Sequence, residues 1–437
     1  MRKTILILLL LFGFLGLPIF AFCQDSMLDK YIREGFDNNL SLKQKELDYR
    51  KSIQFLNQAR AQFYPNISFN ARYSLTDGGR TIDFPVGDLL NPVYTTLNQL
   101  TQSQQFPQID NEEIYFLRPR EQETMLSLRQ PVFHSDIWFN YKIRKELSDA
   151  ASIGIDVYRR ELVNEIKTAY YNYLKTIHAL ELFEQTLDVV NENLRVSESL
   201  FTNDKVTADA VYRSRAELSK VEQQMAEAEK FNESATAYFN FLLNKPLESK
   251  IEVNDSNIMI DSLLLNATSS SEIAVRNREE LHQLREYLQA SAYNVKLNKF
   301  NHAPTLSLGV DYGIQGETYE FSDKADFLFA SVVMQWKIFH GMETKSKIRQ
   351  ASIEQDMLEK QNREVQNQIR LQVIDAWYDV TTSEKAVISA RAQSQSATKA
   401  FEIIRKKYNL GQTSLLEFTN ARSDMTNAGL NMILSSY

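Results

Sequence analysis

Few residues of this 437-residue chain have the types and the spacing that chemistry requires. With 56 acidic side chains, 5 histidines and 1 cysteine, the chain has nucleophiles, bases and metal ligands available in principle. We find no nucleophile paired with a base, no glycine-rich phosphate loop and no metal-binding motif. Carboxylate pairs are frequent, but at this charge density they are typical of solvated helix faces. The sequence therefore predicts a protein that has no catalytic activity and needs no cofactor.

Two histidines, His134 and His340, occupy matching positions just after segments that we predict to be strands. A pair of histidines suggests a metal site, but such a site needs further Cys, His or carboxylate ligands at suitable spacing. The sequence places no such ligand beside either histidine. We therefore expect a structural role for both residues and no bound metal.

The N-terminal residues 1–23 have the features of a secretion signal: a basic start, an apolar stretch over Ile5–Leu17 and a cleavage-type site at Cys23. Cys23, the only cysteine, is either the lipidated first residue of the mature chain or is removed with the signal. The bulky Phe22 favours removal, because lipidation signals normally have a small residue there. A mature chain without Cys23 has no disulfide or thiol chemistry. No other run of 18 apolar residues follows, so we expect no transmembrane helix.

The composition indicates long elements and few turns. The chain has only 13 Gly and 9 Pro, the residues that most often form turns. Its net charge of −7 is spread over both signs. Without a basic tract or interleaved aromatic and basic residues, nothing indicates binding to nucleic acid.

The chain contains a tandem repeat. "FTNDKVTADAVYRSRAE" at 201–217 is similar to "YNLGQTSLLEFTNARSD" at 408–424, which lies 207 positions later. Each copy reads as a helix, two strands separated by a loop, a very long helix, a tip and a returning helix. We assign residues 24–245 to the first repeat, 246–271 to a linker and 272–437 to the second repeat.

The helices are the clearest elements. The opening helices are expected over Leu28 to about Phe63 and Glu272 to about Phe300. Helical periodicity then runs from Trp138 to Leu200 and over 342–408, which at 1.5 Å per residue gives about 90 and 100 Å. From Val211 to Phe239, apolar and small residues recur every three or four positions, as in a coiled-coil seam. This seam fits either helices with two neighbours around a wet interior or an ordinary solvated coiled coil.

The strand segments alternate between apolar and polar residues. We predict strands over 66–75, 123–133, 305–314 and 327–339, with an extracellular loop over 76–122. Strands of about ten residues with one apolar and one polar face are what a transmembrane β-barrel requires. A half-buried soluble sheet is the alternative. In a barrel, the polar residues expected to line the lumen are Ser68, Asn70, Arg72, Arg129, Ser307 and Asp311.

Four strands cannot close a barrel, because the smallest such barrels have about eight. Open sheet edges are not tolerated in lipid. We therefore expect several copies of the chain to share one barrel. A trimer would supply twelve strands, and the accompanying helices would form a matching tube.

The sequence resembles the TolC family of outer-membrane efflux proteins of Gram-negative bacteria. The resemblance covers essentially the whole mature chain and rests on the repeated helix–strand–strand–helix order. It also rests on three motifs, "YP.I.F.A.YSL" from position 64, "QPVF" from position 130 and "YNLGQTSLLEFTNARSD". It implies a mainly helical protomer with a β-barrel part. The family forms trimers in which a twelve-stranded outer-membrane barrel continues into an α-helical tunnel across the periplasm.

The resemblance also implies two sites at the far periplasmic end. The tips that meet an adaptor protein would be Asn203, Asp204, Lys205 and Val206, and Leu410, Gly411, Gln412 and Thr413. The gate would be formed by Tyr408, Glu417, Asn420 and Asp209. Asn420 replaces a family acid, Thr413 a family arginine, Ala210 an acid and Asp204 a glycine, so the gate contacts are expected to differ. Glu417 is alternatively a capping residue, because Ser414 and Glu417 have the spacing of a capping box.

The resemblance implies a passive exit duct that exports small molecules, located in the outer membrane and extending into the periplasm. Its partners would be two further copies, a periplasmic adaptor, an inner-membrane pump reached through that adaptor, and membrane lipid. A protein duct of type I secretion is the alternative within this architecture. A periplasmic adaptor protein is the alternative from another class.

Overall fold

The computed structural model describes residues 27–253 and 266–437. The described residues form two units: residues 50–150 with 283–362, and residues 27–49 with 151–253, 266–282 and 363–437. We call the first the sheet unit and the second the tip unit. The predicted signal peptide, with Cys23, and part of the predicted linker lie outside the described residues.

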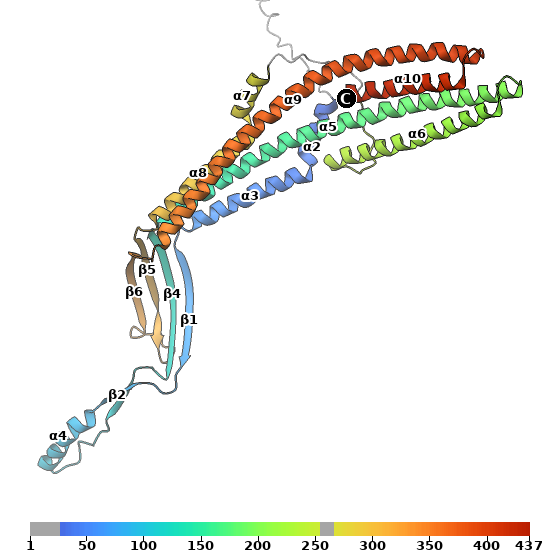
Figure 1. Ribbon diagram of the computed structural model, residues 1–437. Helices are drawn as coiled ribbons and strands as arrows, with labels where there is room; N and C mark the ends of the chain where they lie inside the picture. Colours follow the sequence, from blue (N-terminus) through green and yellow to red (C-terminus); the bar gives the residue numbers. More distant parts are fainter. Residues whose placement is uncertain (1–26, 254–265) are drawn as a thin grey trace, which may run out of the picture. The chain divides into compact units, whose positions relative to one another are not determined.

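The sheet unit contains a four-stranded antiparallel sheet with the strand order β1-β4-β5-β6 (Figure 1). Its strands are β1 (Asn66–Leu75), β4 (Arg120–Phe133), β5 (Thr305–Gly316) and β6 (Asp326–Gln335). Each strand lies on a predicted segment, but β6 ends at Gln335 rather than at residue 339. Gln335 pairs with Thr305, and the preceding Pro304 has no N–H with which to extend the ladder.

The strand register separates a polar face from an apolar face. Ser68 lies opposite Ser127, which lies opposite Asp311, so polar residues of three strands share one face. The other face carries apolar side chains that are exposed on the single chain, including Ile67, Phe69, Tyr73, Leu126, Tyr312, Leu328 and Val332. The predicted alternation is therefore confirmed for β1 and β5, whereas β6 also places Phe329 and Val333 on the polar face, opposite Asp311 and Ser307.

Residues 76–122, which we expected to form a loop, contain ordered elements. The strands β2 (Thr81–Phe84) and β3 (Glu112–Tyr115) pair and flank the helix α4 (Val86–Thr101). The Asn91 amide accepts from the N–H of Ile109 and donates to its carbonyl, both at 2.9 Å, and Asn98 contacts Phe106 in the same way. These amides fix the helix against an extended segment with little apolar burial. The segment is rich in turn-forming residues, and for this reason its helix was not predicted.

The tip unit consists of helices and their connections. The helices that contribute to it are α2 (Met27–Asn38), α3 (Leu40–Ala61), α5 (Ser135–Thr202), α6 (Ala208–Leu242), α7 (Ala267–Asn277), α8 (Glu279–Phe300), α9 (Glu343–Asn409) and α10 (Leu415–Ser436). Four of them, α3, α5, α8 and α9, also contain residues of the sheet unit. Among the described residues, no helix combines the length and the apolar character needed to cross a bilayer.

Each predicted opening helix is interrupted by a single residue. Asn39 ends α2 and caps α3: its oxygen accepts from the N–H of Leu42, and its amide donates to the carbonyl of Leu242, both at 2.9 Å. Arg278 separates α7 from α8 with an extended backbone. Helical periodicity continues across both single-residue breaks, so the sequence pattern does not reveal them.

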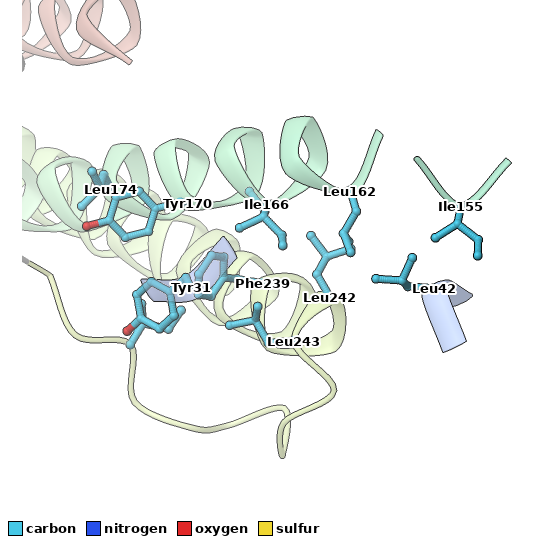
Figure 2. Close-up of a cluster of buried hydrophobic side chains, with 12 residues drawn as sticks. Tyr31, Leu42, Ile155, Leu162, Ile166, Tyr170, Leu174, Phe239, Leu242 and Leu243 are labelled. Carbon is cyan, nitrogen blue, oxygen red and sulfur yellow. The ribbon is translucent and has the colours of Figure 1, made fainter. Parts of the chain in front are cut away.

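An apolar core holds the first helices against α5 and α6 (Figure 2). Tyr31 of α2 packs edge-on against Phe239 of α6, with ring centroids 5.0 Å apart, and Leu162 and Ile166 of α5 are fully buried beside them. A Cβ at Gly35 would lie 2.4 Å from Cδ1 of Ile166, so a larger residue here would force the Ile166 side chain to shift. The buried members of the α6 seam are Val211, Ser214, Val221, Ala228 and Phe239, which confirms the predicted pattern.

An ion pair also ties α5 to α8. Arg160 donates to both oxygens of Glu279 at 2.6 and 2.7 Å, and this hydrogen bonding lowers the pKa of the Glu279 carboxyl. A carboxyl whose pKa is lower in the folded than in the unfolded state stabilises the fold above its ordinary pKa, near 4.5 here. That contribution is lost as the pH falls through the folded-state pKa.

We predict that Glu279→Gln lowers the free energy of unfolding by less than about 1 kcal/mol at neutral pH, because the pair is partly exposed. The difference from the wild type should shrink as the pH falls below the ordinary carboxyl pKa. Chemical denaturation over a pH series measures this. A difference that persists at acid pH would contradict the assignment of the effect to the charged carboxylate.

Candidate functional site

The predicted tips are the connections at which the chain reverses direction after each of its two longest helices, α5 and α9. The first tip joins α5 to α6 and the second joins α9 to α10 (Figure 1). Every tip residue that the resemblance singled out is exposed or half-exposed: Asn203, Asp204, Lys205, Val206, Leu410, Gly411, Gln412 and Thr413. Their side chains and backbone are therefore accessible on the single chain.

Both tips have the same backbone hydrogen bonds although their residues differ. The N–H of Lys205 donates to the carbonyl of Leu200 at 2.9 Å, and the N–H of Gln412 donates to that of Lys407 at 2.8 Å. This bond, with a left-handed residue just before it, is the Schellman ending of a helix. The left-handed residue is Asp204 (φ 53°) in the first tip and Gly411 (φ 70°) in the second.

The helix after the second tip begins with the predicted cap. The hydroxyl of Ser414 accepts from the N–H of Glu417 at 3.2 Å, so the capping role of Ser414 is confirmed. The Glu417 carboxylate accepts from the hydroxyl of Thr413 and remains exposed, as does Asn420. At the first tip, Thr207 donates to the carboxylate of Asp209, which also contacts Arg213 at 3.4 Å.

Tyr408 lies beneath the second tip and is only 3% exposed. Its ring packs on Phe418 with centroids 4.9 Å apart. Its hydroxyl lies 2.9 Å from that of Ser197, which lies 2.9 Å from the hydroxyl of Ser214. Tyr408 thus joins α9 to α5 and α6. Asp209, another predicted gate residue, contacts Arg213 of its own helix instead. Sequence reasoning missed Ser197; the only signal for it was the presence of small polar residues in the neighbouring seam.

A buried ion pair lies one helical turn further from the second tip. Arg422 of α10 is 2% exposed and bonds to Glu217 of α6. Burial lowers the pKa of the Arg422 guanidinium, which nevertheless stays charged. The hydroxyls of Thr426 and Thr186 lie 3.3 Å apart and join α10 to α5. The repeat aligns Arg422 with Arg215, but no local pattern distinguishes the buried arginine from the exposed one.

The polar face of the sheet brings together the residues predicted to line a lumen. Arg129 donates to both oxygens of Asp311 at 2.7 and 2.9 Å, and Arg72 contacts Glu123 at 2.9 Å. Asn70 donates to Ser68 and Ser127, each at 3.3 Å. The register also places Ser307 on this face, opposite Pro131. The structure thus places all six predicted residues on one face.

The two histidines of the repeat also come together in the sheet unit. His134 and His340 line a cavity of about 400 Å³, together with Lys337 and Lys347 among others. Among the described residues, no three His, Cys, Asp or Glu side chains are grouped so as to hold a metal ion.

The arrangement of tips, long helices and a two-faced sheet matches known proteins. The family model for the outer membrane efflux protein matches residues 32–237 and 271–437. This chain belongs to that family. The resemblance inferred from the repeat and its motifs is confirmed, and the alternative of a periplasmic adaptor is set aside. As a member of the outer membrane efflux protein family, the chain is located in the outer membrane and extends into the periplasm.

Individual relatives agree with this assignment. The chain is 22% identical over 292 residues to the proteases secretion protein PrtF of Dickeya chrysanthemi; the match covers 64% of this chain and 61% of that protein's length. It is 19% identical to the outer membrane protein TolC of Escherichia coli, over 92% of this chain and 77% of TolC. The crystal structure of VceC from Vibrio cholerae has the same fold, with a TM-score of 0.75 at 15% identity, covering 94% and 93% of the two chains.

We predict that Gly411→Ala destabilises the second tip by about 1–2 kcal/mol, because a Cβ disfavours the left-handed conformation. Asp204→Gly is the matched change at the first tip and should be neutral or stabilising. Amide hydrogen exchange at the two helix ends measures the local effect. Equal exchange in Gly411→Ala and the wild type would contradict a strained left-handed position.

We predict that Arg422→Gln lowers the free energy of unfolding by about 3 kcal/mol, because it leaves the Glu217 carboxylate poorly solvated and unpaired. Arg215→Gln, at the matching exposed position, should cost less than about 1 kcal/mol. Adding Glu217→Gln to Arg422→Gln should recover part of the loss. Denaturant unfolding of the four proteins tests this, and similar losses for the two arginines would contradict it.

Proposed function

We propose that this protein is a passive exit duct: three copies form a twelve-stranded barrel in the outer membrane, and their helices form a tunnel in the periplasm. The observation that carries this proposal is the four-stranded sheet with one polar and one exposed apolar face. Its outer strands β1 and β6 each have one edge without a strand partner within the described chain. In lipid such edges need partners, and other copies of the same sheet can supply them.

The polar face supports a water-filled lumen. Ser68, Asn70, Arg72, Arg129, Ser307 and Asp311 would line it, and the opposite apolar side chains would contact lipid. The opposite charges of Arg129 and Asp311 pair with each other, so this part of the lumen presents little net charge. Such a lumen passes small polar molecules without strong selection by charge.

The tips are proposed as the gate and as the contact with a periplasmic adaptor. Residues 203–206 and 410–413 are exposed for such a contact. Three copies of Glu417 around the axis would form an acidic ring that attracts cations and disfavours anions. Tyr408, Asn420 and Asp209 complete the proposed gate. The duct has no energy source of its own, so an inner-membrane pump would drive export through the adaptor.

A second candidate is a duct for protein secretion. It is favoured by the similarity to PrtF, which its name describes as a proteases secretion protein. Both candidates share one architecture and differ in cargo and in the inner-membrane partner. Co-purification after crosslinking, with the adaptor and its attached pump identified by mass spectrometry, would distinguish them.

We predict stable trimer-sized channels when the purified protein is added to planar bilayers. Divalent or trivalent cations should block the wild type, and Glu417→Gln should abolish the block because the acidic ring is lost. Glu384→Gln, an exposed acid in the middle of α9, is the control and should remain sensitive. Single-channel conductance measures both effects.

Each outcome has a separate meaning. Channels whose cation block is unchanged by the Glu417 substitution would support the duct but leave Glu417 with only its hydrogen bond to Thr413 at the start of α10. Failure of the folded protein to insert would contradict the duct itself.

A further inference from the structure

The outer strand β6 departs from the face pattern of the other three strands. On β1, β4 and β5, the polar face described above carries mostly polar side chains or glycine. β6 continues this face with Phe327, Phe329 and Val333, which we call the apolar strip. The opposite face of β6 is apolar as well, with Leu328 and Val332 exposed. Alternation of polar and apolar residues therefore does not explain the apolar strip.

The apolar strip is accessible on the single chain. Phe329 is 57% and Val333 is 56% exposed, whereas Phe327 is half-buried opposite Gly313. Successive side chains on one face of a strand lie about 6.8 Å apart, so the strip is about 20 Å long from Phe327 to Val333. Ser331 interrupts it between Phe329 and Val333. The strip is thus a narrow apolar line that runs along most of the strand.

Neither lipid nor a second copy covers the apolar strip in the proposed barrel. The face that carries Ser68 and Asp311 lines the lumen there, so lipid contacts the opposite face. A neighbouring copy would pair with the edge of β6 through backbone hydrogen bonds, and such pairing leaves both faces of the strand uncovered. Large apolar side chains gathered on a surface that faces water mark a site of interaction. A molecule in transit through the lumen is the occupant that remains.

The groups beside the apolar strip are polar and carry little net charge. Phe329 lies opposite Asp311, whose two carboxylate oxygens accept from Arg129 at 2.7 and 2.9 Å. Ser331 of β6 and Ser307 of β5 add hydroxyl groups on the same face. Because Arg129 matches the charge of Asp311, neither a cation nor an anion gains a strong net attraction here. These surroundings suit a molecule that has an apolar ring and uncharged hydrogen-bonding groups.

We infer that the apolar strip binds the rings of uncharged aromatic or aliphatic small molecules as they pass through the barrel. Phe329 stacks against the ring in an offset or edge-on arrangement. Val333 provides the next apolar contact along the strand, and the hydroxyls of Ser331 and Ser307 bond to polar substituents. The inference rests on the proposed duct and names a class of molecule that its lumen binds.

The binding has to be weak for a physical reason. A site along a conduction path must attract a molecule and still release it, and several weak sites in a row achieve this. One aromatic contact changes affinity by about tenfold at most. A ring that leaves Phe329 finds Phe327 or Val333 further along the same strand. The strip therefore guides such molecules along the wall without holding them.

Block of single channels in planar bilayers tests the inference with two matched probes. N-acetyltryptophanamide and N-acetylglutaminamide are both uncharged, and they differ in having an aromatic or a polar side chain. The aromatic probe should interrupt the current of the full-length protein at a concentration about tenfold lower than the polar probe. Equal block by the two probes would overturn the inference.

Substitutions on β6 locate the site. Phe329→Gln should raise the half-blocking concentration of the aromatic probe by about three- to tenfold. Val333→Thr and Val332→Thr form a matched pair, because they make the same change at neighbouring residues on opposite faces of the sheet. Val333→Thr should weaken the aromatic block by about two- to threefold, and Val332→Thr should leave it unchanged. Equal effects of the two valine substitutions would contradict a site on the lumen face.

A gain of binding provides a test that misfolding cannot imitate. Ser331→Val closes the gap in the apolar strip and should strengthen the aromatic block by about threefold. Channels of Ser331→Val that bind the aromatic probe no better than the wild type would contradict the inference, even if Phe329→Gln forms no channels.

The same recordings separate this inference from the proposed duct. If the wild type forms channels that do not distinguish the two probes, the inference fails and the duct stands. If the folded protein forms no channels, both fail.

Discussion

A strand that meets lipid must satisfy all its backbone N–H and C=O groups within protein. In the part of the chain that the structure describes, the sheet has four strands, and one edge of each outer strand, β1 and β6, has backbone N–H and C=O groups without a strand partner. In the proposed duct, this requirement sets the number of copies, because edges must pair until a ring closes. It also brings the helices of every copy round one axis, so the contacts near the tips follow from the same requirement.

The tips show how one backbone conformation is built on different side chains. Gly411 takes the left-handed position without steric cost, whereas Asp204 takes it with a Cβ. The hydrogen bonds that end the preceding helices are nevertheless the same in both repeats. The repeat has therefore kept the reversal and changed the surface chemistry, which allows the two tips to present different residues to a partner.

Buried polar contacts add to the apolar cluster around Phe401, Tyr408 and Phe418 in holding the helices together near the tips. Hydrogen bonds link the hydroxyls of Tyr408, Ser197 and Ser214 between α9, α5 and α6. The pair of Arg422 with Glu217 lies between α10 and α6. Buried polar groups must find partners, so such contacts fix the axial position of one helix against another. An apolar seam would tolerate sliding. In the proposed tunnel, such contacts would keep the register of the helices fixed near the tips.

The sequence by itself determined the duplicated order of elements, the long helices, the two faces of the strands and the family, because each depends on periodicity or on a local motif. It also predicted the Ser414 cap, which needs only residues three positions apart. The tertiary structure alone decided the breaks at Asn39 and Arg278, the helix in the segment 76–122, and the burial of Arg422 but not of Arg215. The physical reason is that these features depend on partners distant in sequence, which no local pattern encodes.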